Sequence, residues 1–236
     1  MRDKSIFRFK QFSIAHKKAT MKVGTDGVLL GAWASVTNAR RILDVGTGSG
    51  VIALMLAQRT QPDTHIDAID ISEDDCKVAQ ENVGQSPWPK KVTIQPCSLQ
   101  ELISEPYDVI VSNPPYFINS YKPPGAKRTR ARHTETLSQH DLLYHSKRLL
   151  SPSGKLTVIL PETEAGKLVE LSYKSGWFCT RKCLFRSRQA KPVERVLLEL
   201  SLQFEPLHAE ELVLYESGEN WSKAYKNLTN AFYLKA

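Results

Sequence analysis

The sequence predicts an α/β fold built on one mostly parallel sheet. Short apolar segments alternate with segments of helical periodicity along the 236 residues, as expected of a chain in which strands and helices alternate. A glycine-rich loop directly follows the apolar segment 41–45, and an Asn-Pro-Pro-Tyr turn directly follows the apolar segment 107–112. Open α/β sheets bind their ligands beyond the carboxyl ends of the strands, so both features indicate a ligand site at that edge.

The chain length suits one well-buried α/β domain and leaves little for a second. Residues 41–236 are expected to form the domain, and residues 1–40 a segment that packs on it, because this segment contains apolar side chains that need partners. These side chains are Phe7, Phe9, Phe12 and Ile14. No apolar stretch approaches the length of a membrane span, and the first residues lack an apolar signal core. We therefore expect a soluble, cytoplasmic protein without a membrane partner.

The strands of the parallel part are expected in chain order. They are 41–45, 65–70, 92–95, 107–112 and 155–160. A helix over 51–58 follows the glycine-rich loop. Two further helices are predicted to begin at Ser72 and Ser138, because each serine has an acid three residues later, Asp75 or Asp141, in a capping pattern. The helix that begins at Ser72 is expected to end near Gly84.

The last part of the chain is expected to complete the sheet with a hairpin. Segments 177–185 and 193–203 both read as strands and leave no room for a helix between them, so they should pair antiparallel. The sequence thus predicts a seven-stranded, mostly parallel sheet with a C-terminal antiparallel hairpin.

The loop Gly46-Thr47-Gly48-Ser49-Gly50 joins the strand 41–45 to the helix after it. Glycines at such a junction let the backbone turn sharply and approach a ligand closely. Val51 stands where a dinucleotide-binding fingerprint requires its third glycine, which disfavours a dehydrogenase. Asp70 ends the next strand, where it can accept hydrogen bonds from ribose hydroxyls, or alternatively complement a helix dipole. These features favour a nucleoside cofactor without a pyrophosphate.

The turn Asn113-Pro114-Pro115-Tyr116 is stiff, because the two prolines fix φ and remove two backbone donors. Its carbonyl groups can accept both hydrogens of a planar, conjugated NH₂ group, while the Tyr116 ring stacks on the π-system that carries the group. A nucleobase amine and a glutamine side-chain amide both fit. A turn with a purely structural role is the alternative.

These motifs resemble those of known enzymes. Residues 44–50 are similar to the first motif of the S-adenosylmethionine-dependent methyltransferases, and residues 113–116 to the motif of those that methylate planar nitrogen. Nearly the whole chain resembles the bacterial tRNA1(Val) (adenine-37-N6)-methyltransferases. The stretches that carry this resemblance are 9–12, 22–31, 131–133 and 230–235.

The resemblance implies a Rossmann-like class I methyltransferase fold, S-adenosyl-L-methionine as cofactor, and transfer of its methyl group to the N6 amine of an adenine in tRNA, at position 37 of a valine tRNA. Asp44 would face the methionine ammonium beside the loop glycines, with Thr25 and Asp26 in a loop closing over the methionine end. Ile71 would lie against the adenine, and Ser98 stands where relatives carry an acid that contacts the adenine amine. The implied cofactor-binding residues are Thr25, Asp26, Asp44, Gly46, Gly48, Gly50, Asp70, Ile71, Ser98 and Asn113, and the implied catalytic residues Asn113, Pro114, Pro115 and Tyr116.

The net charge of +7 and a pI near 9.2 come largely from three basic clusters, which favour a polyanionic partner. The loop cluster, with the neighbouring histidine as a further RNA-binding candidate, comprises Lys122, Lys127, Arg128, Arg130, Arg132 and His133. The hairpin cluster comprises Arg181, Lys182, Arg186, Arg188, Lys191 and Arg195, and the N-terminal cluster Arg2, Lys4, Arg8, Lys10, Lys17, Lys18 and Lys22. We expect the partner to be a tRNA anticodon loop, whose splayed bases are favourable targets. Neither cysteines nor histidines have metal-ligand spacing, so no metal is expected, and a monomer is assumed.

Other functions share some of these features. A protein glutamine-N5 methyltransferase has the same Asn-Pro-Pro-Tyr turn, but it carries a sizeable helical domain before the first strand. An adenine-N6 methyltransferase acting on rRNA stays open. A DNA adenine methyltransferase would need a target-recognition domain, for which there is no room. A catalytically inactive RNA-binding module is disfavoured, because the motif residues are intact.

Overall fold

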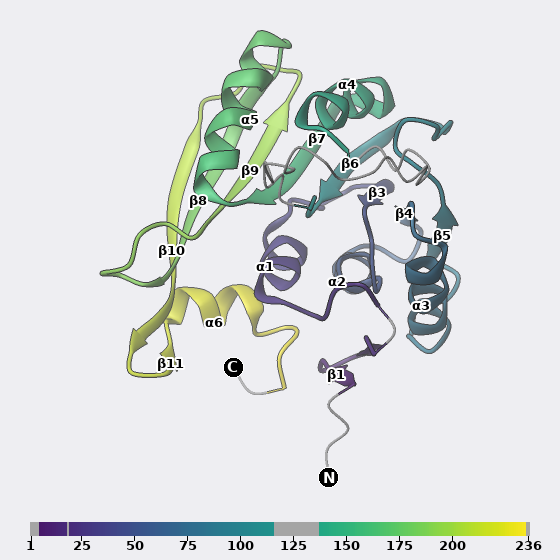
Figure 1. Ribbon diagram of the computed structural model, residues 1–236, viewed down its shortest axis with the longest axis horizontal. Helices are drawn as coiled ribbons and strands as arrows, with labels where there is room; N and C mark the ends of the chain where they lie inside the picture. Colours follow the sequence, from purple (N-terminus) through teal and green to yellow (C-terminus); the bar gives the residue numbers. More distant parts are fainter. Residues whose placement is uncertain (1–4, 18, 116–136, 235–236) are drawn as a thin grey trace, which may run out of the picture.

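The computed structural model describes residues 5–17, 19–115 and 137–234. In this part of the chain one large sheet has the strand order β11-β10-β8-β9-β7-β6-β3-β4-β5 (Figure 1). Its parallel half consists of β3 (Arg41–Val45), β4 (His65–Asp70), β5 (Val92–Pro96), β6 (Tyr107–Ser112) and β7 (Leu150–Leu160). Its other half consists of β8 (Phe178–Arg188), β9 (Arg195–Ser201), β10 (His208–Ser217) and β11 (Asn220–Trp221).

Helices cover both faces of the sheet, and alternate strand residues supply the two cores (Figure 1). Ile42 and Ile159 belong to the core that includes residues of α1 (Thr25–Trp33) and α2 (Val51–Arg59). Their neighbours Leu43 and Val158 belong to the core that includes residues of two helices on the opposite face. These two helices are α4 (Gln139–Leu149) and α5 (Glu162–Lys174), while α3 (Glu73–Gly84) follows β4 and α6 (Lys223–Thr229) follows β11.

The predicted fold class is confirmed, as are the two serine caps. Ser72 accepts a hydrogen bond from the Asp75 backbone N–H at 3.2 Å, and Ser138 accepts one from Asp141 at 3.0 Å. The predicted hairpin is the antiparallel pair β8–β9, and β9 also pairs antiparallel with β7.

The sheet contains two strands more than the predicted seven. The sequence reading missed β10, which pairs parallel to β8, and the short β11 beyond it. Most residues of β10 are exposed or half-buried, so its sequence lacks the continuous apolar run by which the inner strands were identified. No helix of the described residues is long and apolar enough to cross a membrane.

The N-terminal segment forms a separate two-stranded sheet, β1 (Ile6–Arg8) with β2 (Ser13–Ala15). Phe9, Phe12 and Ile14 are buried in the same core as residues of α1 and α2. The segment also meets the other end of the chain, where Lys10 N donates to the Phe232 carbonyl at 2.7 Å and Phe9 forms a bridge with Tyr233. The first and last described segments, β1 and the residues after α6, accordingly lie at one end of the molecule (Figure 1).

Candidate functional site

A cavity of about 660 Å³ lies at the carboxyl edge of the parallel strands. Its walls come from the segments that follow β3, β4, β5 and β6, from the first turn of α1, and from the β8–β9 hairpin. The predicted site residues that line it are Thr25, Asp26, Gly46, Gly48, Asp70, Ile71, Asn113, Pro114 and Pro115. Asp44, Gly50 and Ser98 are not among its lining residues.

The glycine-rich loop is shaped by left-handed backbone conformations. Gly46 and Gly48 have φ of 74° and 54°, and a Cβ at either position would meet nothing within 4 Å. The backbone of the loop therefore forms an open wall that a ligand can approach. Gly50 has a different role, because a Cβ there would lie 3.3 Å from the Cβ of Ala79 and would strain the packing of the loop on α3.

Asp44 lies beneath this loop and is fully buried. Its Oδ2 accepts hydrogen bonds from Thr47 Oγ1 at 2.7 Å and from the Ala53 backbone N–H at 3.2 Å, which join the loop to α2. Its Oδ1 is buried without a hydrogen-bond partner among the described residues. Burial raises the pKa of Asp44 to about 7, although the two hydrogen bonds oppose that shift. The predicted contact with a methionine ammonium remains a prediction.

Asp70 ends β4 and lines the cavity next to the loop. One carboxylate oxygen accepts from Gly48 N at 2.9 Å, and the other accepts from Ser72 N at 2.9 Å. The side chain is thus held by backbone on both sides. The next residue, Ile71, is 57% exposed although it is large and apolar, and it also lines the cavity. This pair offers a carboxylate and an apolar surface side by side.

Asn113, Pro114 and Pro115 follow β6 directly and line the cavity together with Ser112. The buried Ser112 hydroxyl donates to the Val45 carbonyl at 3.0 Å, which fixes the end of β6 against the end of β3. The turn and the glycine-rich loop each lie at a strand end, as the sequence predicts, and the structure shows that the two strands are neighbours. Tyr116 and the loop cluster lie outside the described residues; these positions are Tyr116, Lys122, Lys127, Arg128, Arg130, Arg132 and His133.

The structure places Ser98 away from the cavity. Its hydroxyl donates to Glu101 Oε2 at 2.8 Å and caps the turn after β5. Cys97, Leu99 and Gln100 line the cavity instead. The resemblance implies Ser98 only as a hydroxyl in place of an acid, whereas the direction of the turn decides which side chains reach the cavity.

Thr25 and Asp26 begin helix α1 and do not lie in a loop, contrary to the sequence reading. The N-terminal cap residue, Gly24, provides no side-chain hydrogen bond, and the first turn of the helix lines the cavity. Asp26 Oδ2 accepts a hydrogen bond from Arg195 Nε at 2.8 Å, so an ion pair joins α1 to the first residue of β9.

Two groups of lining residues were missed. The first is the strap, defined here as residues 20–24, of which Thr20, Met21, Lys22 and Gly24 line the cavity. Asp75 of α3 accepts from both Thr20 N and Thr20 Oγ1, at 2.8 and 2.6 Å, and so anchors the strap. The second group comes from the distal strands and comprises Phe185, Ser187, Glu194, Arg195 and Leu214. Only pairing between distant segments brings these residues to the site, and no local motif marks them.

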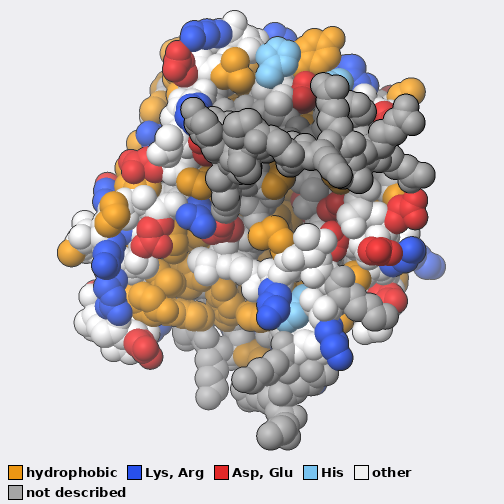
Figure 2. Space-filling view, viewed as in Figure 1, with side chains coloured by type: hydrophobic (Ala, Val, Ile, Leu, Met, Phe, Trp, Pro, Cys, Tyr) orange, Lys and Arg blue, Asp and Glu red, His pale blue; other side chains and the backbone are white. Residues whose placement is uncertain are grey.

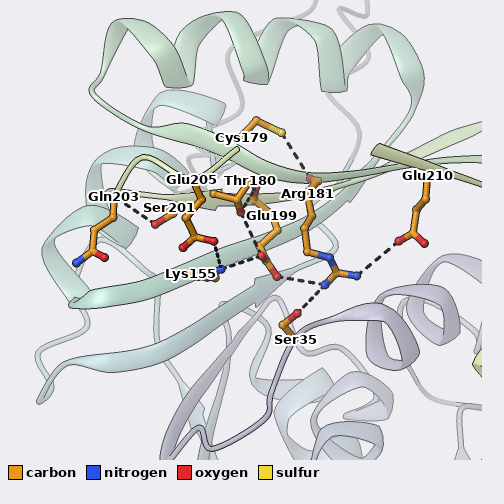
Figure 3. Close-up of polar contacts among 10 residues, drawn as sticks. All are labelled: Ser35, Lys155, Cys179, Thr180, Arg181, Glu199, Ser201, Gln203, Glu205 and Glu210. Carbon is orange, nitrogen blue, oxygen red and sulfur yellow. Dashed lines mark hydrogen bonds and ion pairs between the residues drawn. The ribbon is translucent and has the colours of Figure 1, made fainter. Parts of the chain in front are cut away.

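Three of the six cations of the hairpin cluster form ion pairs with acids that are distant in sequence. Arg181 contacts the fully buried Glu199 at 3.4 Å and Glu210 at 3.5 Å, and Figure 3 shows this guanidinium between the two carboxylates. Arg186 contacts Glu211 at 3.6 Å, and Arg195 is paired with Asp26. The hairpin therefore presents less free positive charge than its sequence suggests. No group of three or more potential metal ligands occurs in the described part of the chain.

Comparison with known proteins agrees with this geometry. The family model of the methyltransferase small domain matches residues 19–171. The chain is 42% identical to the tRNA1(Val) (adenine(37)-N6)-methyltransferase of Tolumonas auensis over 97% of both chains. It is 45% identical to the protein of the same name from Trichodesmium erythraeum, over 97% of this chain and 98% of that protein.

Two solved structures have the same fold at low sequence identity. A predicted O-methyltransferase from Agrobacterium tumefaciens superposes with a TM-score of 0.69 at 14% identity, covering 88% of this chain and 96% of that one. A ribosomal protein L11 methylase from Lactobacillus delbrueckii superposes with a TM-score of 0.59 at 18% identity, covering 80% and 83%. These likenesses show the fold alone.

Proposed function

Because this chain belongs to the family of tRNA1(Val) (adenine(37)-N6)-methyltransferases, we propose that it transfers a methyl group from S-adenosylmethionine to the N6 amine of an adenine in tRNA. The observation that carries the proposal is the meeting, in one cavity, of the glycine-rich loop, the carboxylate of Asp70 and the turn that begins at Asn113. Adenine 37 in the anticodon loop of a valine tRNA is the target that the names of the relatives support.

The cavity suits S-adenosylmethionine. Asp70 would accept hydrogen bonds from the ribose hydroxyls, and the exposed face of Ile71 would cover the adenine. Gly46 and Gly48 leave open space where side chains would otherwise stand, so the loop can approach the methionine moiety. When bound, this cofactor supplies a methyl group on an electrophilic sulfonium.

Asn113 and the adjoining proline carbonyl would bind the target amine. The lone pair of an adenine N6 amine is delocalised into the ring, which makes it a poor nucleophile. Hydrogen bonds from its N–H groups to the Asn113 side-chain carbonyl and a proline carbonyl would raise its electron density and favour pyramidalisation in the transition state. The remaining task of the protein is to hold amine, methyl and sulfur in line and to exclude water. No general base is required, because the product ammonium is acidic and releases its proton to water.

The roles proposed for Tyr116 and for the loop cluster rest on the sequence alone. Stacking on Tyr116 would stabilise the unstacked adenine by about 1–3 kcal/mol, comparable with the few kcal/mol needed to take a base out of its stack. The cations of the loop cluster, Lys122, Lys127, Arg128, Arg130 and Arg132, would neutralise phosphates of the anticodon loop, and His133 would help to order it.

The proposal is tested by incubating the purified protein with methyl-labelled S-adenosylmethionine and an unmodified valine tRNA transcript, followed by mass spectrometry of nuclease fragments. We expect N6-methyladenine in the anticodon-loop fragment alone. Asn113→Ala should abolish the product while cofactor affinity, measured by calorimetry, stays within a few-fold of the wild type. Absence of label in tRNA, with label on glutamine of a protein substrate instead, would refute the proposal.

A further inference from the structure

The wall of the cavity continues into a region of half-buried aromatic side chains. Leu214 of β10 lines the cavity, and its carbonyl accepts a hydrogen bond from Ser222 N at 2.8 Å. This bond places Trp221, the neighbour of Ser222, beside the wall, where it also pairs with Tyr215 of β10. The region beyond the cavity is therefore built by the strands β10 and β11 that the sequence did not predict.

Three aromatic rings from distant parts of the chain meet there. The ring of Trp221 lies 4.9 Å from that of Tyr233, and the ring of Phe7 lies 6.2 Å from that of Tyr233. We call Phe7, Trp221 and Tyr233 the platform. All three are only partly buried against the core, in contrast to the neighbouring Phe9, Tyr225 and Phe232, which are at most 4% exposed. The buried rings pack in the core near both ends of the chain. The platform rings lie further out, so part of the surface of each is accessible.

The surroundings of the platform combine apolar surface with positive charge. In Figure 2, hydrophobic side chains gather at the lower left, where Figure 1 places α6 and the lower part of β10. Arg8 next to Phe7 and Lys22 on the strap are exposed, and the Arg188 guanidinium lies 5.1 Å from the ring of Tyr215. Two exposed acids are also present, Glu216 near the end of β10 and Glu219 in the turn that follows it.

We propose that Phe7, Trp221 and Tyr233 form a stacking platform for an unpaired base of the RNA substrate that lies near the methylated adenine in the same strand. The inference rests on the proposed function, because it assumes that the cavity receives one nucleotide of an RNA. A strand that inserts one base into the cavity must place its neighbours on the adjoining surface. Partly accessible aromatic rings with cations nearby suit the bases and the phosphates of a single strand.

The first experiment compares substitutions at Trp221. Trp221→Leu keeps an apolar side chain but removes the aromatic face, whereas Trp221→Phe keeps a smaller one. We expect Trp221→Leu to raise the dissociation constant for an anticodon stem-loop, and the KM for it, by about tenfold. The kcat at saturating RNA and the affinity for S-adenosylmethionine should not change. Trp221→Phe should restore most of the RNA affinity.

A matched control is Phe204→Leu, which removes a 75% exposed ring that pairs with Phe178 and does not line the cavity. This variant should bind the stem-loop as the wild type does. An abasic nucleotide at the stacked position should weaken wild-type binding by the same factor as Trp221→Leu, and the two changes together should weaken it no further. Wild-type affinity and KM in Trp221→Leu would overturn the platform.

Crosslinking of the wild-type protein tests whether the platform contacts RNA even if the Trp221→Leu variant does not fold. Stem-loops with a photoreactive uridine at each loop position are irradiated with the wild type, and the linked peptide is identified by mass spectrometry. Crosslinks to Phe7, Trp221 or Tyr233 support the platform, and crosslinks confined to other segments refute it. Methylation of the same stem-loop by the wild type tests the proposed function separately, so failure of one can be told from failure of the other.

Discussion

Asp26 and Arg195 form an ion pair at the cavity, with 2.8 Å between Oδ2 and Nε. Asp26 lies in the first turn of α1, and Arg195 is the first residue of β9. Their side chains are only 21% and 29% exposed, so solvent screens the pair less than it would screen a surface pair. The pair therefore fixes the position of the α1 N-terminus relative to the hairpin, and both residues line the cavity.

Arg195→Ala should weaken the binding of S-adenosylmethionine by roughly fivefold, or about 1 kcal/mol, because the first turn of α1 loses its fixed position. Calorimetry measures this change. The matched control is Arg186→Ala, which breaks a hairpin ion pair with Glu211 that does not line the cavity, and it should leave cofactor affinity unchanged. Equal losses in the two variants would show that the effect comes from the hairpin as a whole.

Asp70→Ala should weaken cofactor binding by about 1.5–3 kcal/mol, because a ribose loses a charge-assisted hydrogen bond. The Gly48 and Ser72 backbone N–H groups also lose their acceptor, which adds to the loss. Asp74→Ala is the control, since Asp74 is 87% exposed and contacts only Lys77 among the described residues. If cofactor affinity survives Asp70→Ala, Asp70 serves only to cap the backbone around it.

The buried Asp44 should make stability depend on pH in an unusual direction. Burial raises its pKa from 3.8 to about 7, so between these values the folded protein retains a proton that the unfolded chain has lost. The contribution of Asp44 to the free energy of unfolding therefore falls by at most about 4 kcal/mol as pH rises from about 4 to about 7. Above pH 7 this contribution is constant. The Asp44→Asn variant has no carboxyl group at this position, so it lacks this pH dependence.

Urea unfolding of the wild type and of Asp44→Asn at several pH values measures this contribution. The free energy of unfolding of the variant, relative to the wild type, should increase between pH 4 and pH 7 and then level off. A constant difference across this range would mean that the carboxyl group titrates normally despite its burial.

Neutralising Lys127, Arg128 and Arg130 together should change the salt dependence of tRNA binding. Five phosphate contacts by the loop cluster would give a log–log slope of about −3.5, and loss of three should flatten it by roughly two units. The KM for tRNA should rise, while the dissociation constant for S-adenosylmethionine stays unchanged. Arg186→Gln is the control. Because the Arg186 cation is already paired with Glu211, its loss should leave the slope nearly unchanged. An unaltered slope in the triple variant would exclude the loop cluster from RNA binding.

The parallel half of the sheet could be read from the sequence because its strands are continuous apolar runs, and the two serine caps marked helix starts at Ser72 and Ser138. The strand β10 could not, since it is stabilised by pairing with β8 while most of its side chains face solvent. Arg195 illustrates the same limit at the site. Its sequence neighbours suggested an RNA-facing cation, whereas its position depends on Asp26, which is distant along the chain.

The contacts between Lys10 and Phe232, and between Phe9 and Tyr233, have a consequence for biosynthesis. A ribosome delivers the chain from its N-terminus, so β1 and β2 emerge long before the residues that hold them. The strap follows β2 after residues 16–19 and lines part of the cavity. The nascent chain can therefore assemble the parallel strands while it is still being translated, but the segment between β1 and β2 gains its contacts with Phe232 and Tyr233 only when these residues have left the exit tunnel.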